Sequence, residues 1–134
     1  MYIERALEPL VRRYSENFKI VAVTGPRQVG KTTMLKHLME EEAESGVDRV
    51  YVTLDNTAIL QTAKEDPALF LQRYRPPVLI DEIQKAPELL PYIKMIVDER
   101  DDCGSVWITG SQPLHLMKAV SESLAGRVEV GGQA

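Results

Sequence analysis

Nine consecutive residues constrain this chain more than any other stretch: Gly25-Pro26-Arg27-Gln28-Val29-Gly30-Lys31-Thr32-Thr33. They fit the pattern Gly-x-x-x-x-Gly-Lys-[Ser/Thr], in which the glycines let the backbone approach a ligand and successive N–H groups enclose anionic oxygens. Lys31 adds positive charge near the β- and γ-phosphates of a nucleotide, and the Thr32 hydroxyl is a suitable ligand for Mg²⁺. The motif therefore predicts a phosphate-binding loop, with residues 25–33 as its binding residues.

The sequence around this motif has the context that the loop requires. Residues 19–24 form an apolar run before it, and apolar residues at helical spacing follow it: Met34, Leu35, Leu38 and Met39. The alternative is a Gly/Pro turn that binds nothing. A strand, a loop and a helix in this order favour the phosphate-binding interpretation.

A second motif supplies acidic groups. The apolar run Val78-Leu79-Ile80 leads directly into Asp81 and Glu82. This is the Walker B pattern, in which the first carboxylate helps to hold Mg²⁺ together with Thr32. Glu82 could accept a proton from an attacking water molecule or orient that water. Apolar strands often end in acidic residues, so this motif alone is a weak signal. It becomes persuasive because it follows a phosphate-binding loop in the same sheet.

Several further residues are weaker candidates. Ser111 could sense the γ-phosphate, although Thr109 and Gln112 compete for that role and a simple polar turn is an alternative. Arg127 could act across a subunit contact as an arginine finger or be a surface residue. Asp55 could face the site from the end of a strand or serve only as a turn former.

The apolar patterns predict alternating strands and helices. We expect strands at 19–24, 50–54, 78–80, 105–109 and 128–130, helices at 2–14, 31–43, 87–100 and 113–124, and one or two short helices within 57–74. Trp107 is expected in the core. Short apolar strands separated by helices indicate an α/β protein with a mainly parallel sheet. A chain of 134 residues suffices for one such domain.

Composition excludes several classes of function. The net charge of −4 argues against a broad nucleic-acid-binding face. Cys103 is the single cysteine, so the chain cannot form an internal disulfide. No apolar run approaches the length of a membrane span, and the charged N-terminus differs from a signal peptide. We therefore expect a cytoplasmic protein without a membrane partner.

Four segments together resemble one family, the prokaryotic AAA-type ATPases described as ATP-binding proteins with a C-terminal domain of unknown function. The segments are GPRQVGKTT, VLIDEIQKAPELLPYIK, ITGSQ and SESLAGRVEV. The resemblance implies a P-loop NTPase three-layer sandwich with a sheet of about five strands in the order 5-1-4-3-2. It also implies ATP and Mg²⁺ as cofactors, Asp81 as the Walker B acid, Glu82 as the catalytic glutamate and a polar sensor near Ser111. Lys31, Glu82 and Ser111 are thus the expected catalytic residues, with Thr32 and Asp81 as the metal ligands.

Members of that family continue past the fifth strand, whereas this sequence stops at Ala134. We therefore expect residues 1–134 to form a single nucleotide-binding domain without the lid and the following domain. The expected function is Mg²⁺-dependent ATP binding and hydrolysis. The alternatives are a low-activity regulatory module, whose ATP state controls a partner or a missing domain, and a small-molecule kinase. A homo-oligomer is a further expectation. ATP rather than GTP rests on the resemblance, because the loop recognises only phosphates.

Overall fold

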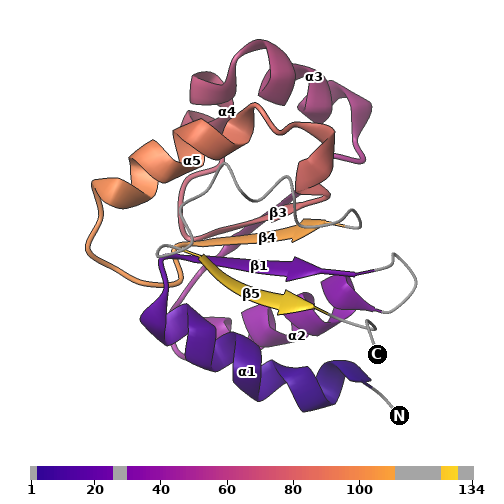
Figure 1. Cartoon of the computed structure of the whole chain (residues 1–134), viewed down its shortest axis with the longest axis vertical. Helices are drawn as coiled ribbons and strands as arrows, with labels where there is room; N and C mark the ends of the chain where they lie inside the picture. Colours follow the sequence, from indigo (N-terminus) through magenta and orange to yellow (C-terminus); the bar gives the residue numbers. More distant parts are fainter. Residues whose placement is uncertain (1–2, 26–29, 111–124, 130–134) are drawn as a thin grey trace.

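A computed structural model describes residues 3–25, 30–110 and 125–129 of the chain (Figure 1). The loop residues 26–29, the candidates Ser111 and Gln112, the predicted helix 113–124 and residue 130 lie outside the described residues. The strands of the sheet are β1 (Ile20–Thr24), β2 (Val50–Thr53), β3 (Val78–Asp81), β4 (Val106–Gly110) and β5 (Ala125–Glu129).

The sheet has the predicted topology. Its strand order is β2-β3-β4-β1-β5, which is the order 5-1-4-3-2 read from the other edge. All four strand pairings are parallel. The strands β1, β3 and β4 are buried along their whole length, as expected for central strands that are covered on both faces.

Helices cover both faces of the sheet and complete three layers (Figure 1). The helices α1 (Ile3–Asn17) and α2 (Lys31–Glu44) lie on one face. The other face is covered by α3 (Thr57–Glu65), α4 (Pro67–Arg73) and α5 (Leu89–Asp98). Alternate residues of β1 therefore enter different cores: Val21 and Val23 pack with α1 and α2, whereas Ile20 and Ala22 belong to the opposite core.

Some boundaries differ from the prediction for identifiable reasons. Helix α1 continues through Pro9 to Asn17. Helix α5 begins at Leu89, after an unpredicted 3₁₀ helix η2 (Ile83–Lys85), and Pro91 occupies its first turn. Amides of a first turn have no acceptor within the helix, so Pro91 removes no helical hydrogen bond. Strand β5 starts earlier than the predicted 128–130, because pairing with β1 extends it back to Ala125.

The far end of α2 is held by a buried guanidinium group. Arg49 forms two hydrogen bonds of 2.8 Å with the carboxylate of Glu42. It also donates to the carbonyls of Gly104, at 2.8 Å, and Val78, at 3.4 Å, which precede or begin β4 and β3. Its guanidinium carbon lies 3.8 Å from the ring centroid of Trp107, which is in the core as predicted. Arg49 thus joins α2 to the amino ends of two strands.

No helix within residues 3–25, 30–110 and 125–129 combines the length and the apolar character that crossing a membrane requires.

Candidate functional site

The carboxyl ends of four strands gather polar residues at one edge of the sheet. Strand β1 ends at Thr24, β2 at Thr53, β3 at Asp81 and β4 at Gly110. Because the strands are parallel, these ends lie at the same edge, which is where open α/β sheets bind ligands. The amide of Gly25 donates to the carbonyl of Gly110 at 3.1 Å, so the start of the phosphate-binding loop is fastened to β4.

The described ends of the phosphate-binding loop have the backbone that the motif predicts. Gly25 has φ 152° and Gly30 has φ 82°, conformations that favour glycine. Gly30 then caps the start of α2, so the positive end of the helix faces the loop. Lys31 is only 3% exposed, and its ammonium group donates to the carbonyl of Gly25 at 2.8 Å. A buried cation is therefore held against the first residue of the loop, while Thr33 is exposed in the same helical turn.

Four hydroxyl groups surround the carboxylate of Asp81. Thr32 donates to Oδ1 at 3.0 Å and Thr109 donates to the same oxygen at 2.6 Å. Thr53 and Tyr51 donate to Oδ2 at 3.0 Å and 3.2 Å. Asp81 is 6% exposed, so these bonds replace hydration that the ionised carboxylate loses on burial. The phosphate-binding loop and the acidic strand end thus meet through Thr32 and Asp81.

This arrangement has the chemistry that a magnesium ion needs. Carboxylate and hydroxyl oxygens are the hard ligands that Mg²⁺ prefers, and the ion commonly keeps several water ligands. Tyr51 is held in its neutral, donating form, because burial and then the charge of Asp81 raise its pKa to about 12. The residues present therefore fit a hydrated Mg²⁺ ion bound between Thr32 and Asp81.

The backbone at Glu82 is unusual. This residue has φ 63° and ψ 51°, a left-handed conformation that is uncommon outside glycine and often marks functional sites. Its amide donates to the hydroxyl of Thr109 at 3.0 Å, and its Oε1 accepts from the Gln84 side chain at 2.6 Å. Glu82 is 5% exposed. The second acidic residue is thus held at the strand end by contacts from β4 and from η2.

Asp55 lies beside this pair. One carboxylate oxygen each from Asp55, Asp81 and Glu82 lie within 4.8 Å of one another. Asp55 is exposed and forms an ion pair of 2.6 Å with Lys85. The structure therefore places Asp55 beside the acidic pair, and a role for it in binding stays a prediction.

Three residues of this neighbourhood were missed by sequence reasoning: Tyr51, Thr53 and Gln84. Tyr51 and Thr53 alternate along β2 and so share one face of the strand. The spacing of these two residues can be read from the sequence. The register that sets Thr53 opposite Asp81 depends on how β2 pairs with β3 in the folded chain. Thr109 was considered only as a competitor of Ser111, whereas its hydroxyl contacts both Asp81 and Glu82.

Other predicted residues cannot be placed. Pro26, Arg27, Gln28, Val29 and Ser111 lie outside the described residues. The backbone of Arg127 pairs with Ala22 in the sheet, but its side chain also lies outside the description.

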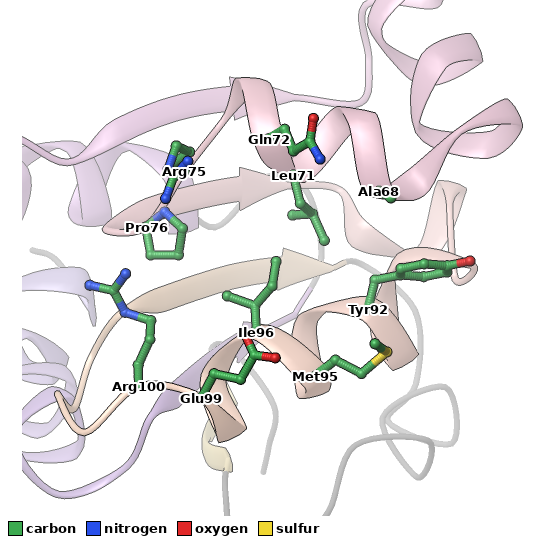
Figure 2. A pocket seen from close by; sticks show the side chains of 10 residues that line it. All are labelled: Ala68, Leu71, Gln72, Arg75, Pro76, Tyr92, Met95, Ile96, Glu99 and Arg100. Atoms are coloured by element: carbon green, nitrogen blue, oxygen red, sulfur yellow. The ribbon is translucent and has the colours of Figure 1, made fainter.

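A groove elsewhere on the molecule is separate from this site (Figure 2). It lies between α4 and α5 and has a volume of about 440 Å³. In Figure 2, Leu71 and Ile96 form its apolar middle, and Arg75 and Arg100 lie at one end. These arginines precede β3 and β4, so that end of the groove lies toward the amino ends of the strands, opposite the edge that carries Asp81.

The chain belongs to the AAA domain family, whose sequence profile matches residues 17–131. Uncharacterized proteins of Mycobacterium bovis and Mycobacterium tuberculosis are each 34% identical to the chain over 120 residues, which is 90% of the chain. Each match covers 26% of the relative, so the chain spans about a quarter of the length of these curated relatives.

Solved structures show the same fold. DnaA from Aquifex aeolicus bound to AMPPCP has a TM-score of 0.60 and 17% identity, with 96% of this chain and 46% of that chain covered. A DNA replication initiation factor has a TM-score of 0.57 and 15% identity over 94% of this chain and 44% of that chain. At these identities the likeness establishes the fold, a P-loop AAA-type α/β domain.

Proposed function

We propose that this chain binds ATP together with Mg²⁺ and hydrolyses it to ADP and phosphate. Membership of the AAA domain family supports nucleotide binding. The observation that carries the finer proposal is the contact of Thr32 with Asp81, at 3.0 Å, next to the buried Lys31. This contact brings together the two halves of a site that holds phosphate and a metal ion.

Each residue has a distinct role in the proposal. The backbone amides of residues 25–33 and the ammonium group of Lys31 hold the phosphates, and Thr32 and Asp81 hold Mg²⁺. When bound, Mg²⁺ neutralises charge that develops on the phosphate oxygens. Glu82 accepts the proton of the water that attacks the γ-phosphorus, and Ser111 is proposed to sense the γ-phosphate.

An acidic side chain directly after Asp81 supports water rather than a small molecule as the acceptor. The carboxylates of Asp81 and Glu82 lie close enough to share one reaction centre, yet they have different partners. One carboxylate can serve the metal ion while the other serves the water molecule. A kinase would instead need a binding site for its acceptor, and transfer of phosphate to such an acceptor would revive that alternative.

Nucleotide binding is tested first, by melting-temperature titration with ATP and GTP, with and without Mg²⁺. A ligand that binds only the folded chain raises the melting temperature, by an amount that grows with the logarithm of its concentration divided by its Kd. We expect a larger rise with ATP than with GTP and a further rise with Mg²⁺. An unchanged melting temperature at millimolar nucleotide would contradict the proposal.

Hydrolysis is tested by steady-state turnover of the wild type and of Glu82→Gln. We expect the variant to bind ATP normally and to lose turnover by roughly 10²–10⁴-fold, the usual contribution of a general base. Equal rates in both proteins would remove Glu82 from the mechanism.

A second function is a regulatory module whose nucleotide state controls a partner or another domain. It is supported by the curated relatives, in which the matching region is only 26% of the protein. Tight ATP binding without turnover, in this chain and in a longer relative alike, would favour it over hydrolysis. We also propose that the chain forms a homo-oligomer in which Arg127 acts across a subunit contact. A cytoplasmic location is a further proposal.

A further inference from the structure

The side chain of Gln84 occupies a defined position between two strand ends. It belongs to η2, and its amide nitrogen lies 2.6 Å from Oε1 of Glu82. A Cβ atom added to Gly110, at the end of β4, would meet the amide oxygen of Gln84 at 3.0 Å. That distance is closer than ordinary van der Waals contact, so the absence of a side chain at Gly110 leaves the space in which the Gln84 amide lies.

The residues around this amide are linked to one another. The hydroxyl of Thr109 accepts the amide hydrogen of Glu82 and donates to Asp81. The next residue, Gly110, accepts from the amide of Gly25 at the start of the phosphate-binding loop. The end of β4 therefore connects the loop with the acidic pair, and Gln84 packs on this end while it holds the Glu82 carboxylate.

We propose that Gln84 is a positioning residue that sets the orientation of the Glu82 carboxylate for the attacking water. Hydrogen bonding of one carboxylate oxygen, together with the left-handed backbone of Glu82, restricts the directions in which the carboxylate can point. A misplacement of about 1 Å at a reacting group can lower a rate by up to 10²-fold. The inference rests on the proposed hydrolytic function and adds a determinant of its rate.

The decisive experiment is a double-mutant cycle on turnover with Gln84→Ala, Glu82→Gln and the double variant. We expect Gln84→Ala to lower kcat by about tenfold while KM and the Kd for ATP stay unchanged, because Gln84 acts on the reacting water through Glu82. In the Glu82→Gln background, Gln84→Ala should have no further effect. A matched control is Gln61→Ala, which removes a similar glutamine–glutamate hydrogen bond of 3.0 Å on the exposed surface of α3 and should leave kcat unchanged.

Gly110→Ala perturbs the position of the Gln84 side-chain amide without replacing Gln84 itself. The added methyl group would displace the Gln84 side chain, so kcat should fall in this variant as well. Melting temperatures separate these effects from loss of folding. Because Gln84 is only partly buried, Gln84→Ala should melt within a few degrees of the wild type.

A spectroscopic measurement tests the contact without turnover. The side-chain amide signals of Gln84 in a ¹H–¹⁵N spectrum, assigned by their loss in Gln84→Ala, should move in Glu82→Ala and stay in place in Gln61→Ala. Unmoved signals, or an unchanged kcat in Gln84→Ala while Glu82→Gln abolishes turnover, would overturn the inference and leave the proposed function intact. Absence of turnover in the wild type, or equal rates in Glu82→Gln, would instead overturn both.

Discussion

The hydroxyl of Thr32 lies 3.0 Å from the carboxylate of Asp81, although 49 positions separate the two residues in the chain. This contact joins the first turn of α2 to the end of β3. It arises because β1 and β3 run in parallel, so that the loop after one and the acidic end of the other share an edge. The position of the Asp81 carboxylate therefore depends on Thr32 after the loop and on Thr53 and Thr109 of the neighbouring strands.

Replacement of Lys31 by alanine should weaken ATP binding. Its ammonium group is buried against the loop, where a charge-assisted contact with phosphate is expected to contribute about 1.5–3 kcal/mol. We therefore expect Kd to rise by roughly 10- to 100-fold in titration calorimetry. Lys94→Ala is the matched control, because Lys94 forms an exposed ion pair with Asp98 on α5 and should leave Kd unchanged. Wild-type affinity in Lys31→Ala would argue against phosphate binding at this loop.

Replacement of Thr109 by valine should lower both stability and turnover. The variant keeps the shape of the side chain but removes the acceptor for the Glu82 amide and a donor to Asp81. Leaving buried polar groups unpaired should lower the free energy of unfolding by about 1–3 kcal/mol, measured by urea denaturation. Thr62→Val removes only a long hydroxyl contact on exposed α3 and should change stability little. Similar losses in the two variants would contradict the role given to Thr109.

Tyr51 should make stability depend on alkaline pH. Its pKa rises from the ordinary 10.0 to about 12, first through burial and then through the charge of Asp81. The unfolded phenol loses its proton near pH 10 while the folded one retains it, so the free energy of unfolding falls as pH rises from 10 toward 12. Below pH 10 both phenols are neutral and the contribution is fully present.

Comparison with Tyr51→Phe isolates this effect. The variant cannot lose a phenolic proton, so its stability should fall less steeply between about pH 10 and pH 12. The measurement is urea denaturation at several pH values with both proteins. Parallel curves would show that Tyr51 ionises equally in the folded and unfolded chains.

Replacement of Arg49 by methionine should destabilise the domain strongly. The side chain of Arg49 is 2% exposed and that of its partner Glu42 is 21% exposed, so removal leaves a carboxylate that is only partly solvated. Breaking a buried pair costs about 3–5 kcal/mol, and partial exposure of Glu42 reduces the expected loss to about 2–4 kcal/mol. Arg73→Met, on the exposed surface of α4, is the control for urea denaturation. A loss no larger than that of the control would contradict this role of Arg49.

The family resemblance predicted the strand order, and local patterns in the sequence predicted the meeting of Thr32 with Asp81. The order followed from the family resemblance, and the convergence followed from two strand ends in one parallel sheet. The surroundings of Asp81 were not predictable in the same way. Thr53 reaches Asp81 because of the register between β2 and β3, and register leaves no local trace in a short strand.

The position of Gln84 escaped prediction for a related reason. The pattern of apolar residues suggested that a helix would begin near Pro87, and it gave no sign of η2 before it. Glu82 has a left-handed backbone where β3 gives way to η2, and the Gln84 amide, two residues further on, lies 2.6 Å from its carboxylate. Glutamate is not a residue that predicts such a conformation, whereas Gly30 belongs to a motif that requires glycine there.

The hydrogen bonds of Arg49 with Glu42 and with the sheet also have a mechanical consequence for α2. One end of this helix carries Lys31 and Thr32, and the other end carries Glu42, which is fixed to the sheet through Arg49. A rigid rod that is pinned at one end can pivot, but it cannot slide along its axis. Because Val11 of α1 packs in the same core as Leu35 and Leu38 of α2, a change in the direction of α2 would change its packing against α1.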